Sequence, residues 1–236
     1  MRNPTGHPAR FSDSIIDHFK TLLVADERVH DPFAGTGEQL GRLADEIGFR
    51  FTGTEIEQSF IVDPRVRLGD STKRASYPRT RGWTGCTSPV YPNGNADYFA
   101  SSSDEKKPWK RNTYRHAIAK RSGGAITELA DNNMARFGYR GTKPMGQSTK
   151  RIAYWDLARR CVPYWSSAAW FVLNVSDFQS GDYTEPLVGQ WVTLMEENGW
   201  AIERFDTVVT PRYRNGSDES RDQRVEAEAV ILFRRG

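Results

Sequence analysis

The chain has 236 residues, a net charge of +3 and a hydrophobic fraction of 37%, which suits one α/β domain with an insertion or two small domains. It contains no apolar run of the ~18 residues that a membrane helix needs, and its N-terminus lacks the apolar region of a secretory signal, so we expect a cytoplasmic protein without a membrane partner. Two cysteines and four scattered histidines provide neither a disulfide framework nor a metal cluster.

Strand and helix patterns alternate in the first part of the chain. Apolar residues at helical spacing predict a helix over 12–24, with Ser12 as its N-cap. Short apolar runs predict strands over 28–31, 49–55, 66–69 and 82–87, and a helix over 37–47 separates the first two. This alternation predicts parallel strands joined by right-handed crossovers.

The same alternation returns near the C-terminal end. We predict a helix over 151–164, a buried strand over 168–175, a helix over 185–198 that ends at Gly199, and strands over 200–209 and 225–233. No helix separates the last two strands, so the final one is expected to run antiparallel. The predicted fold class is α/β, with a Rossmann-like, seven-stranded, mostly parallel, doubly wound sheet and an inserted basic segment.

The inserted segment concentrates positive charge. Residues 101–151 contain twelve Lys or Arg and four Asp or Glu, a net +8, which leaves about −5 on the rest of the chain. Aromatic residues are interleaved with these cations, as suits a phosphate backbone and unstacked bases. We therefore predict nucleic-acid contacts at Lys106, Lys107, Lys110, Arg111, Arg136 and Arg140. A solvated loop whose charges only aid solubility is an equal alternative.

The string DPFAGTG, residues 31–37, stands where the first strand gives way to a helix. Gly35 and Gly37 allow a sharp turn and close approach of a ligand, and Glu55, at the end of the next strand, can accept a hydrogen bond from a ribose diol. Position 40 is Leu, so the third glycine of a dinucleotide-binding turn is missing. Asp31 would repel phosphate and attract an ammonium group, which favours S-adenosylmethionine (SAM). A plain tight turn is the alternative.

Four strings in one order then carry a family resemblance: DPFAGTG, GTE (53–55), GD (69–70) and TSPVY (87–91). Together they resemble the amino-group DNA methyltransferases of phages and bacteria, which methylate N4 of cytosine or N6 of adenine. The segment 7–11, and the later strings LNVSDF (173–178), TPRYR (210–214) and RVEAEAVILF, are similar to further segments of these enzymes, so the resemblance spans nearly the whole chain.

The resemblance implies one methyltransferase domain over 1–236. Its parts are a SAM-binding half (1–82), a catalytic loop (83–99), the basic insertion as a possible DNA-recognition element (100–151) and the remainder of the sheet (152–236). The implied cofactor-binding residues are Phe11, Asp31, Pro32, Phe33, Ala34, Gly35, Gly37, Glu55 and Asp70. The implied partner is DNA, most naturally double-stranded. Arg212 and Arg214 are further candidate DNA contacts. For the arginines beyond residue 214, a polar hairpin whose charges pair with one another is as good an explanation as DNA binding.

The loop at 87–91 is the implied catalytic site, with Ser88, Pro89 and Tyr91. An exocyclic amine becomes a better nucleophile when acceptors bind its hydrogens, and the Pro89 carbonyl and Ser88 hydroxyl are candidate acceptors. Tyr91 would stack on a base flipped out of the duplex. The family's second proline is Val90 here, which removes a φ constraint and leaves the acceptors intact. Ser88 tilts the expected base slightly toward cytosine N4.

Other functions are compatible with the sequence. Cys86 and Cys161 lack the Pro-Cys context of a cytosine C5 enzyme, and each is expected to be a small buried residue, so C5 chemistry is excluded. A SAM-dependent methyltransferase of RNA or of a protein amide is one alternative. A catalytically degenerate scaffold that binds DNA is the other, with Val90 as its sign.

Overall fold

A computed structural model of the chain describes residues 11–90, 147–180, 183–210 and 227–236. The described chain forms a seven-stranded sheet in the order β3-β2-β1-β4-β5-β9-β8. The strands are β1 (Arg28–Asp31), β2 (Arg50–Glu55), β3 (Val66–Leu68), β4 (Trp83–Thr87), β5 (Ala168–Val175), β8 (Trp200–Val209) and β9 (Ala227–Arg235). Strands β1 to β5 are parallel to one another, whereas β9 is antiparallel to both β5 and β8, as predicted.

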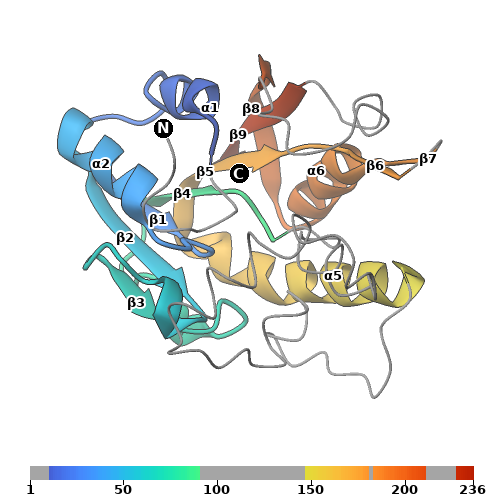
Figure 1. Cartoon of the computed structure of the whole chain (residues 1–236), viewed down its shortest axis with the longest axis horizontal. Coiled ribbons are helices and arrows are strands. Elements are labelled where there is room, and N and C mark those ends of the chain that lie inside the picture. Colours follow the sequence, from blue (N-terminus) through green and yellow to red (C-terminus); the bar gives the residue numbers. More distant parts are fainter. Residues whose placement is uncertain (1–10, 91–146, 181–182, 211–226) are drawn as a thin grey trace, which may run out of the picture.

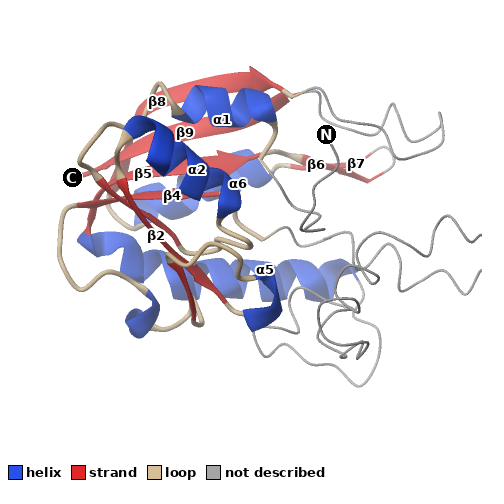
Figure 2. Cartoon of the chain, turned by 60° about the vertical axis from the view of Figure 1, so that its left-hand side comes forward, coloured by secondary structure: helices blue, strands red, loops and turns tan. Residues whose placement is uncertain are grey.

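Helices cover both faces of this sheet (Figures 1 and 2). One face carries α1 (Asp13–Phe19) and α2 (Glu38–Ile47), and the other carries α5 (Gln147–Cys161), the 3-10 segment η5 (Val162–Ser167) and α6 (Leu187–Glu197). In Figure 2, α1 and α2 lie in front of the strands and α5 and α6 behind them. The predicted doubly wound α/β fold is confirmed.

The element boundaries follow from local chemistry. Ser12 caps α1 by accepting the backbone N–H of Ile15, as predicted, but the helix ends at Phe19 and not at residue 24. Helix α5 begins at Gln147, four residues before the predicted start, and Pro163 lies in the 3-10 segment that follows it. Gly199 takes φ +79° just after α6, the left-handed conformation expected at a helix C′ position.

A hairpin of two short strands was not predicted. It consists of β6 (Phe178–Ser180) and β7 (Tyr183–Glu185), which pair antiparallel between β5 and α6. The predicted helix over 185–198 therefore starts two residues late, at Leu187.

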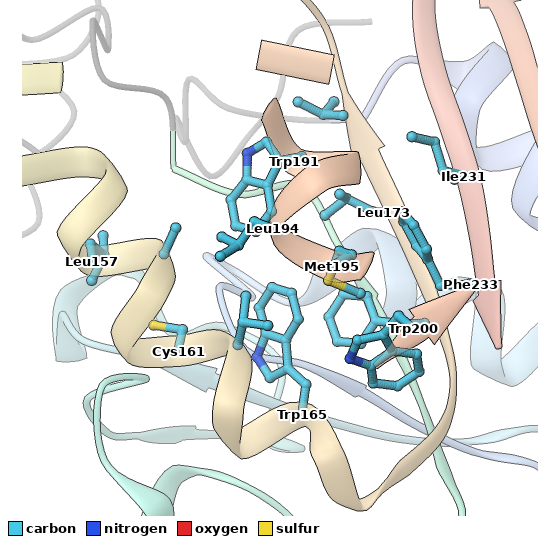
Figure 3. Close-up of a cluster of buried hydrophobic side chains, with 14 of the residues drawn as sticks. Leu157, Cys161, Trp165, Leu173, Trp191, Leu194, Met195, Trp200, Ile231 and Phe233 are labelled. Atoms are coloured by element: carbon cyan, nitrogen blue, oxygen red, sulfur yellow. The ribbon is translucent and has the colours of Figure 1, made fainter. Parts of the chain in front are cut away.

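The larger core lies between the sheet and the α5–α6 layer and is rich in aromatic rings (Figure 3). Trp165 stacks on Phe171 with ring centroids 4.0 Å apart and lies parallel to Trp191 at 5.9 Å. Stacked, fully buried indole rings exclude water over a large area, so this aromatic layer fixes α5 and α6 on the sheet.

Two smaller 3-10 turns, η1 (Gln58–Phe60) and η2 (Arg74–Ser76), lie in the loops on either side of β3.

Candidate functional site at the carboxyl edge of the sheet

Three of the predicted cofactor-binding acids lie at the ends of neighbouring strands. Asp31 ends β1, Glu55 ends β2, and Asp70 follows β3 after one glycine. Because β1, β2 and β3 are parallel and adjacent, these ends share one edge of the sheet, where open α/β sheets bind ligands. The sequence prediction that these acids belong to one site is consistent with this arrangement.

Asp31 is buried and is held from two sides. Its Oδ1 accepts the backbone N–H of Phe33 at 2.8 Å and the hydroxyl of Thr87 at 2.6 Å. Burial raises the pKa of Asp31 from 3.8 to about 7, with a smaller contribution from the Glu55 charge, while the two hydrogen bonds act in the opposite direction. Both hydrogen bonds end on Oδ1, so within the part of the chain that the structure describes Oδ2 remains available for a ligand.

The glycine turn brings the next strand's acid against its backbone. Gly35 and Gly37 have φ of +54° and +71°, conformations that favour glycine. The Gly35 N–H donates to Glu55 Oε2 at 3.0 Å, and Glu55 Oε1 accepts the backbone N–H of Glu57 at 2.9 Å. A Cβ at Gly37 would stand 2.3 Å from Val66 Cγ2, so α2 starts in close contact with β3.

Helix α2 approaches its neighbours through a glycine that the sequence analysis overlooked. A Cβ at Gly41 would lie 1.9 Å from Asp63 Oδ2 and 2.7 Å from Arg65 Nη2. Gly41 therefore lets α2 approach the Asp63–Arg65 ion pair in the segment before β3.

Asp70 is oriented by a chain of hydrogen bonds that reaches α5. Its Oδ1 accepts both the backbone N–H and the hydroxyl of Thr72, at 2.8 and 2.7 Å. Arg160, near the end of α5, donates to the same Thr72 hydroxyl oxygen at 3.1 Å. Neither Thr72 nor Arg160 belongs to a string that the sequence analysis singled out, and residues 88 positions apart meet only in the folded chain.

The proposed catalytic loop begins beside the cofactor turn. Thr87, the last residue of β4 and the first of TSPVY, is fully buried and donates to Asp31. Ser88 is half-buried, Pro89 is buried, and Val90 packs against the larger core. The structure therefore gives Val90 a packing role in place of the proline. Tyr91 lies outside the described residues.

The remaining cofactor candidates support the turn. The backbone of Phe11 exchanges two hydrogen bonds with the Gln39 side chain of α2, both at 2.8 Å, and its ring meets Phe19 edge-on at 5.0 Å. The carbonyl oxygen of Pro32 accepts the Ser71 hydroxyl, and Phe33 packs at the border of the larger core. The Ala34 N–H donates to Thr54 O at 3.0 Å.

The two cysteines are buried, as predicted. Burial raises the pKa of Cys161 to about 12 and that of Cys86 well above its usual value, so neither is a thiolate at neutral pH.

Among the described residues, no group of His, Cys, Asp and Glu could hold a metal ion. No helix in the described ranges has the length and apolar character needed to cross a bilayer.

The predicted DNA contacts stay predictions. Lys106, Lys107, Lys110, Arg111, Arg136, Arg140, Arg212 and Arg214 all lie outside the described residues.

Comparison with known proteins supports the fold. No family model and no curated protein matches the chain. A crystal structure of the [4+2]-cyclase SpnF superposes with a TM-score of 0.50 at 11% identity, covering 94% of this chain and 81% of that one. A putative methyltransferase in complex with the Trm112 activator of Haloferax volcanii gives a TM-score of 0.47 at 8% identity, covering 90% and 83% of the two chains. A putative DNA modification methylase from Thermus thermophilus gives a TM-score of 0.37 at 14% identity over 71% of this chain and 50% of that one. At such identities the likeness to the cyclase is one of fold alone, that of a seven-stranded Rossmann-like α/β sheet.

Proposed function

We propose that the protein is a SAM-dependent methyltransferase that modifies an exocyclic amino group of a flipped DNA base, with cytosine N4 slightly preferred over adenine N6. The observation that carries the proposal is the 2.6 Å hydrogen bond from Thr87 to Asp31. It joins the first residue of TSPVY to the first residue of DPFAGTG. The cofactor turn and the proposed base-binding loop therefore start side by side at one edge of the sheet.

The residues at this edge fit SAM. Asp31 Oδ2 is available for an ammonium group, and a carboxylate at that position disfavours the phosphates of a dinucleotide. Glu55 and the Gly35 backbone flank the space where a ribose diol would bind, and Asp70 is a hydrogen-bond acceptor at the end of the neighbouring strand. Bound SAM would supply a methyl group activated by its sulfonium.

The loop after β4 supplies the other half of the chemistry. The Pro89 carbonyl and the Ser88 hydroxyl would accept the two hydrogens of the target amine and leave its lone pair directed at the methyl group. Ser88 stands next to Thr87, so the hydrogen bond of Thr87 to Asp31 ties the position of these acceptors to the cofactor turn. Transfer in this arrangement depends on positioning and needs no covalent enzyme intermediate.

Methyl transfer to DNA tests the proposal directly. Labelled SAM is incubated with unmethylated duplex DNA, and the digested nucleosides are identified by mass. We expect N4-methylcytosine, lost in Tyr91→Ala and strongly reduced in Ser88→Ala. N6-methyladenine would retain the enzyme class and overturn the base. Transfer to tRNA or to protein instead of DNA would overturn the substrate, and SAM binding without any transfer would favour the degenerate scaffold.

Cofactor binding has its own test, which uses the pKa of Asp31. An ammonium group beside Asp31 favours the ionised carboxylate, so binding below pH 7 must release a proton. We expect the affinity for S-adenosylhomocysteine to rise with pH by up to about tenfold per unit and to level off above pH 7. The affinity for 5′-methylthioadenosine, which lacks the ammonium group, should not follow this profile. Parallel profiles for the two ligands would contradict the assigned role of Asp31.

A further inference from the structure

We propose that the loop between β3 and β4 binds the phosphate backbone of the duplex that carries the target base. This surface, here called the cationic loop, consists of residues 67–81 together with Arg28, which packs against the loop. It is separate from the basic insertion, and it depends on the proposed function for the identity of its partner as DNA.

The cationic loop carries uncompensated positive charge. Residues 67–81 contain five cations and a single acid, Asp70, whose carboxylate is engaged by Thr72. All five cations are exposed: Arg67, Lys73, Arg74, Arg79 and Arg81. In the part of the chain that the structure describes, no carboxylate lies within ion-pair distance of any of them.

The arginines that have partners donate to uncharged oxygen atoms, mostly backbone carbonyls. Arg28 donates to Thr80 Oγ1 at 2.5 Å and to the carbonyl oxygen of Arg81 at 2.6 Å. Arg67 donates to the carbonyl oxygen of Ala75 at 2.9 Å, and Arg74 donates to that of Pro78 at 3.1 Å. A carbonyl dipole satisfies the N–H groups without cancelling the formal charge, so each guanidinium keeps its attraction for an anion.

These contacts also fix the loop before any partner arrives. Tyr77, at its centre, is 1% exposed, and its hydroxyl donates to the carbonyl oxygen of Ser71 at 2.6 Å. Thr54 of β2 donates to the carbonyl oxygen of Ser76 at 2.7 Å. A preformed loop loses little conformational entropy on binding, which distinguishes this surface from an unstructured run of charges.

The loop begins beside the proposed active site and runs to the opposite edge of the sheet. It leaves the carboxyl edge of the sheet at Asp70 and returns at Trp83, the first residue of β4 and hence at the opposite edge. The five residues of β4 span about 17 Å at ~3.3 Å per residue. Arg79 and Arg81 therefore lie toward the edge opposite the proposed active site, beside Arg28 at the start of β1, and any phosphate that they contact is remote from the target base.

Nucleic acid fits this surface better than an acidic protein does. Exposed guanidinium groups match phosphate oxygens in geometry, and the surface begins next to a residue of the proposed cofactor site. A closely spaced series of cations, with no carboxylate between Thr72 and Gly82, suits a partner with regularly repeated negative charge.

Salt-dependent binding tests the inference. The affinity of the full chain for a 40-bp duplex is measured against KCl concentration for the wild type and for Arg79→Gln/Arg81→Gln. The matched control is Arg42→Gln/Arg234→Gln, which removes two exposed arginines from α2 and β9. We expect the slope of log K against log [KCl] to become shallower by about 2 in the first double variant and to change little in the control.

Methyl transfer measured on the same samples separates this inference from the proposed function. Unchanged slopes in Arg79→Gln/Arg81→Gln, or equal losses in the control, would overturn the inference even if the wild type methylates DNA. A loop-dependent slope without methyl transfer would support the inference and overturn the proposed reaction. Absence of any duplex binding by the wild type would overturn the inference, and binding of an acidic polypeptide in preference to DNA would do the same.

Discussion

Replacement of Asp31 by Asn should stabilise the protein while it removes the proposed ammonium contact. The pKa of Asp31 is 3.8 in an unfolded chain and about 7 in the folded protein. Each pKa unit corresponds to about 1.4 kcal/mol, so the ionised carboxylate destabilises the folded state by about 4 kcal/mol above pH 7. Asn keeps an oxygen for the Phe33 N–H and the Thr87 hydroxyl and carries no charge, so most of this cost disappears.

The sign of the pH dependence follows from proton binding. Between pH 4 and 7 the folded wild type holds a proton on Asp31 that the unfolded chain has released, so this residue lowers the stability as pH rises. His30 acts in the opposite direction, because burial, helped by the charge of Arg67, lowers its pKa from 6.5 to about 3. The stability that neutral His30 provides is present above pH 6.5 and is lost as pH falls toward 3. In the wild type the two neighbours oppose each other between about pH 4 and 6.5.

Urea unfolding of wild type and Asp31→Asn at pH 4.5, 6 and 8 checks this reasoning. The difference in unfolding free energy should grow in favour of the variant by about 3 kcal/mol between pH 4.5 and 8. In the variant the His30 contribution should remain, so its stability should rise with pH through this range. A difference that stays constant across the three pH values would refute the raised pKa and the reasoning based on it.

Two further predictions concern the supports of the site. Gly41→Ala should destabilise the protein by about 1–3 kcal/mol, because its Cβ would clash with Asp63. Gly189→Ala, in helix α6, has nothing within 4 Å of the added Cβ and should stabilise the protein by up to about 1 kcal/mol. Thermal melts of both variants measure these changes, and equal effects would contradict the close approach of α2. Thr72→Val removes the hydroxyl that orients Asp70, so it should weaken binding of S-adenosylhomocysteine by about 1 kcal/mol or more, as calorimetric titration would measure. An unchanged affinity would contradict the role given to this hydroxyl.

Much of the fold could be predicted because its strands are short apolar runs separated by helical patterns. Strand β5 matches its predicted range, and the antiparallel final strand followed from the absence of a helix after residue 209. The hairpin at 178–185 could not be predicted, since its six paired residues are mostly polar and have no apolar alternation. Periodicity also gives no information on where a strand inserts in a sheet, so the position of β9 between β5 and β8 came only with the structure.

The candidate site was predictable to the extent that it lies at strand ends. Asp31, Glu55 and the glycine turn have a local sequence signature, and the structure groups them as expected. Contacts between distant residues have no such signature: the hydrogen bond of Thr87 to Asp31 joins positions 56 apart. Gly41 was missed for the same reason, because the side chains that it approaches, Asp63 and Arg65, are distant from it in the sequence.

The position of β9 has a consequence for synthesis of the chain on the ribosome. Residues 227–235 form the strand that separates β5 from β8, so a nascent chain that has emerged only to residue 226 cannot assemble this side of the sheet. Until β9 emerges, β5 has an unpaired edge and the ten residues of β8 have no neighbour to pair with. Exposed strand edges of this kind recruit other strands, so stalled or nonsense-truncated chains should be prone to aggregation and to capture by nascent-chain chaperones.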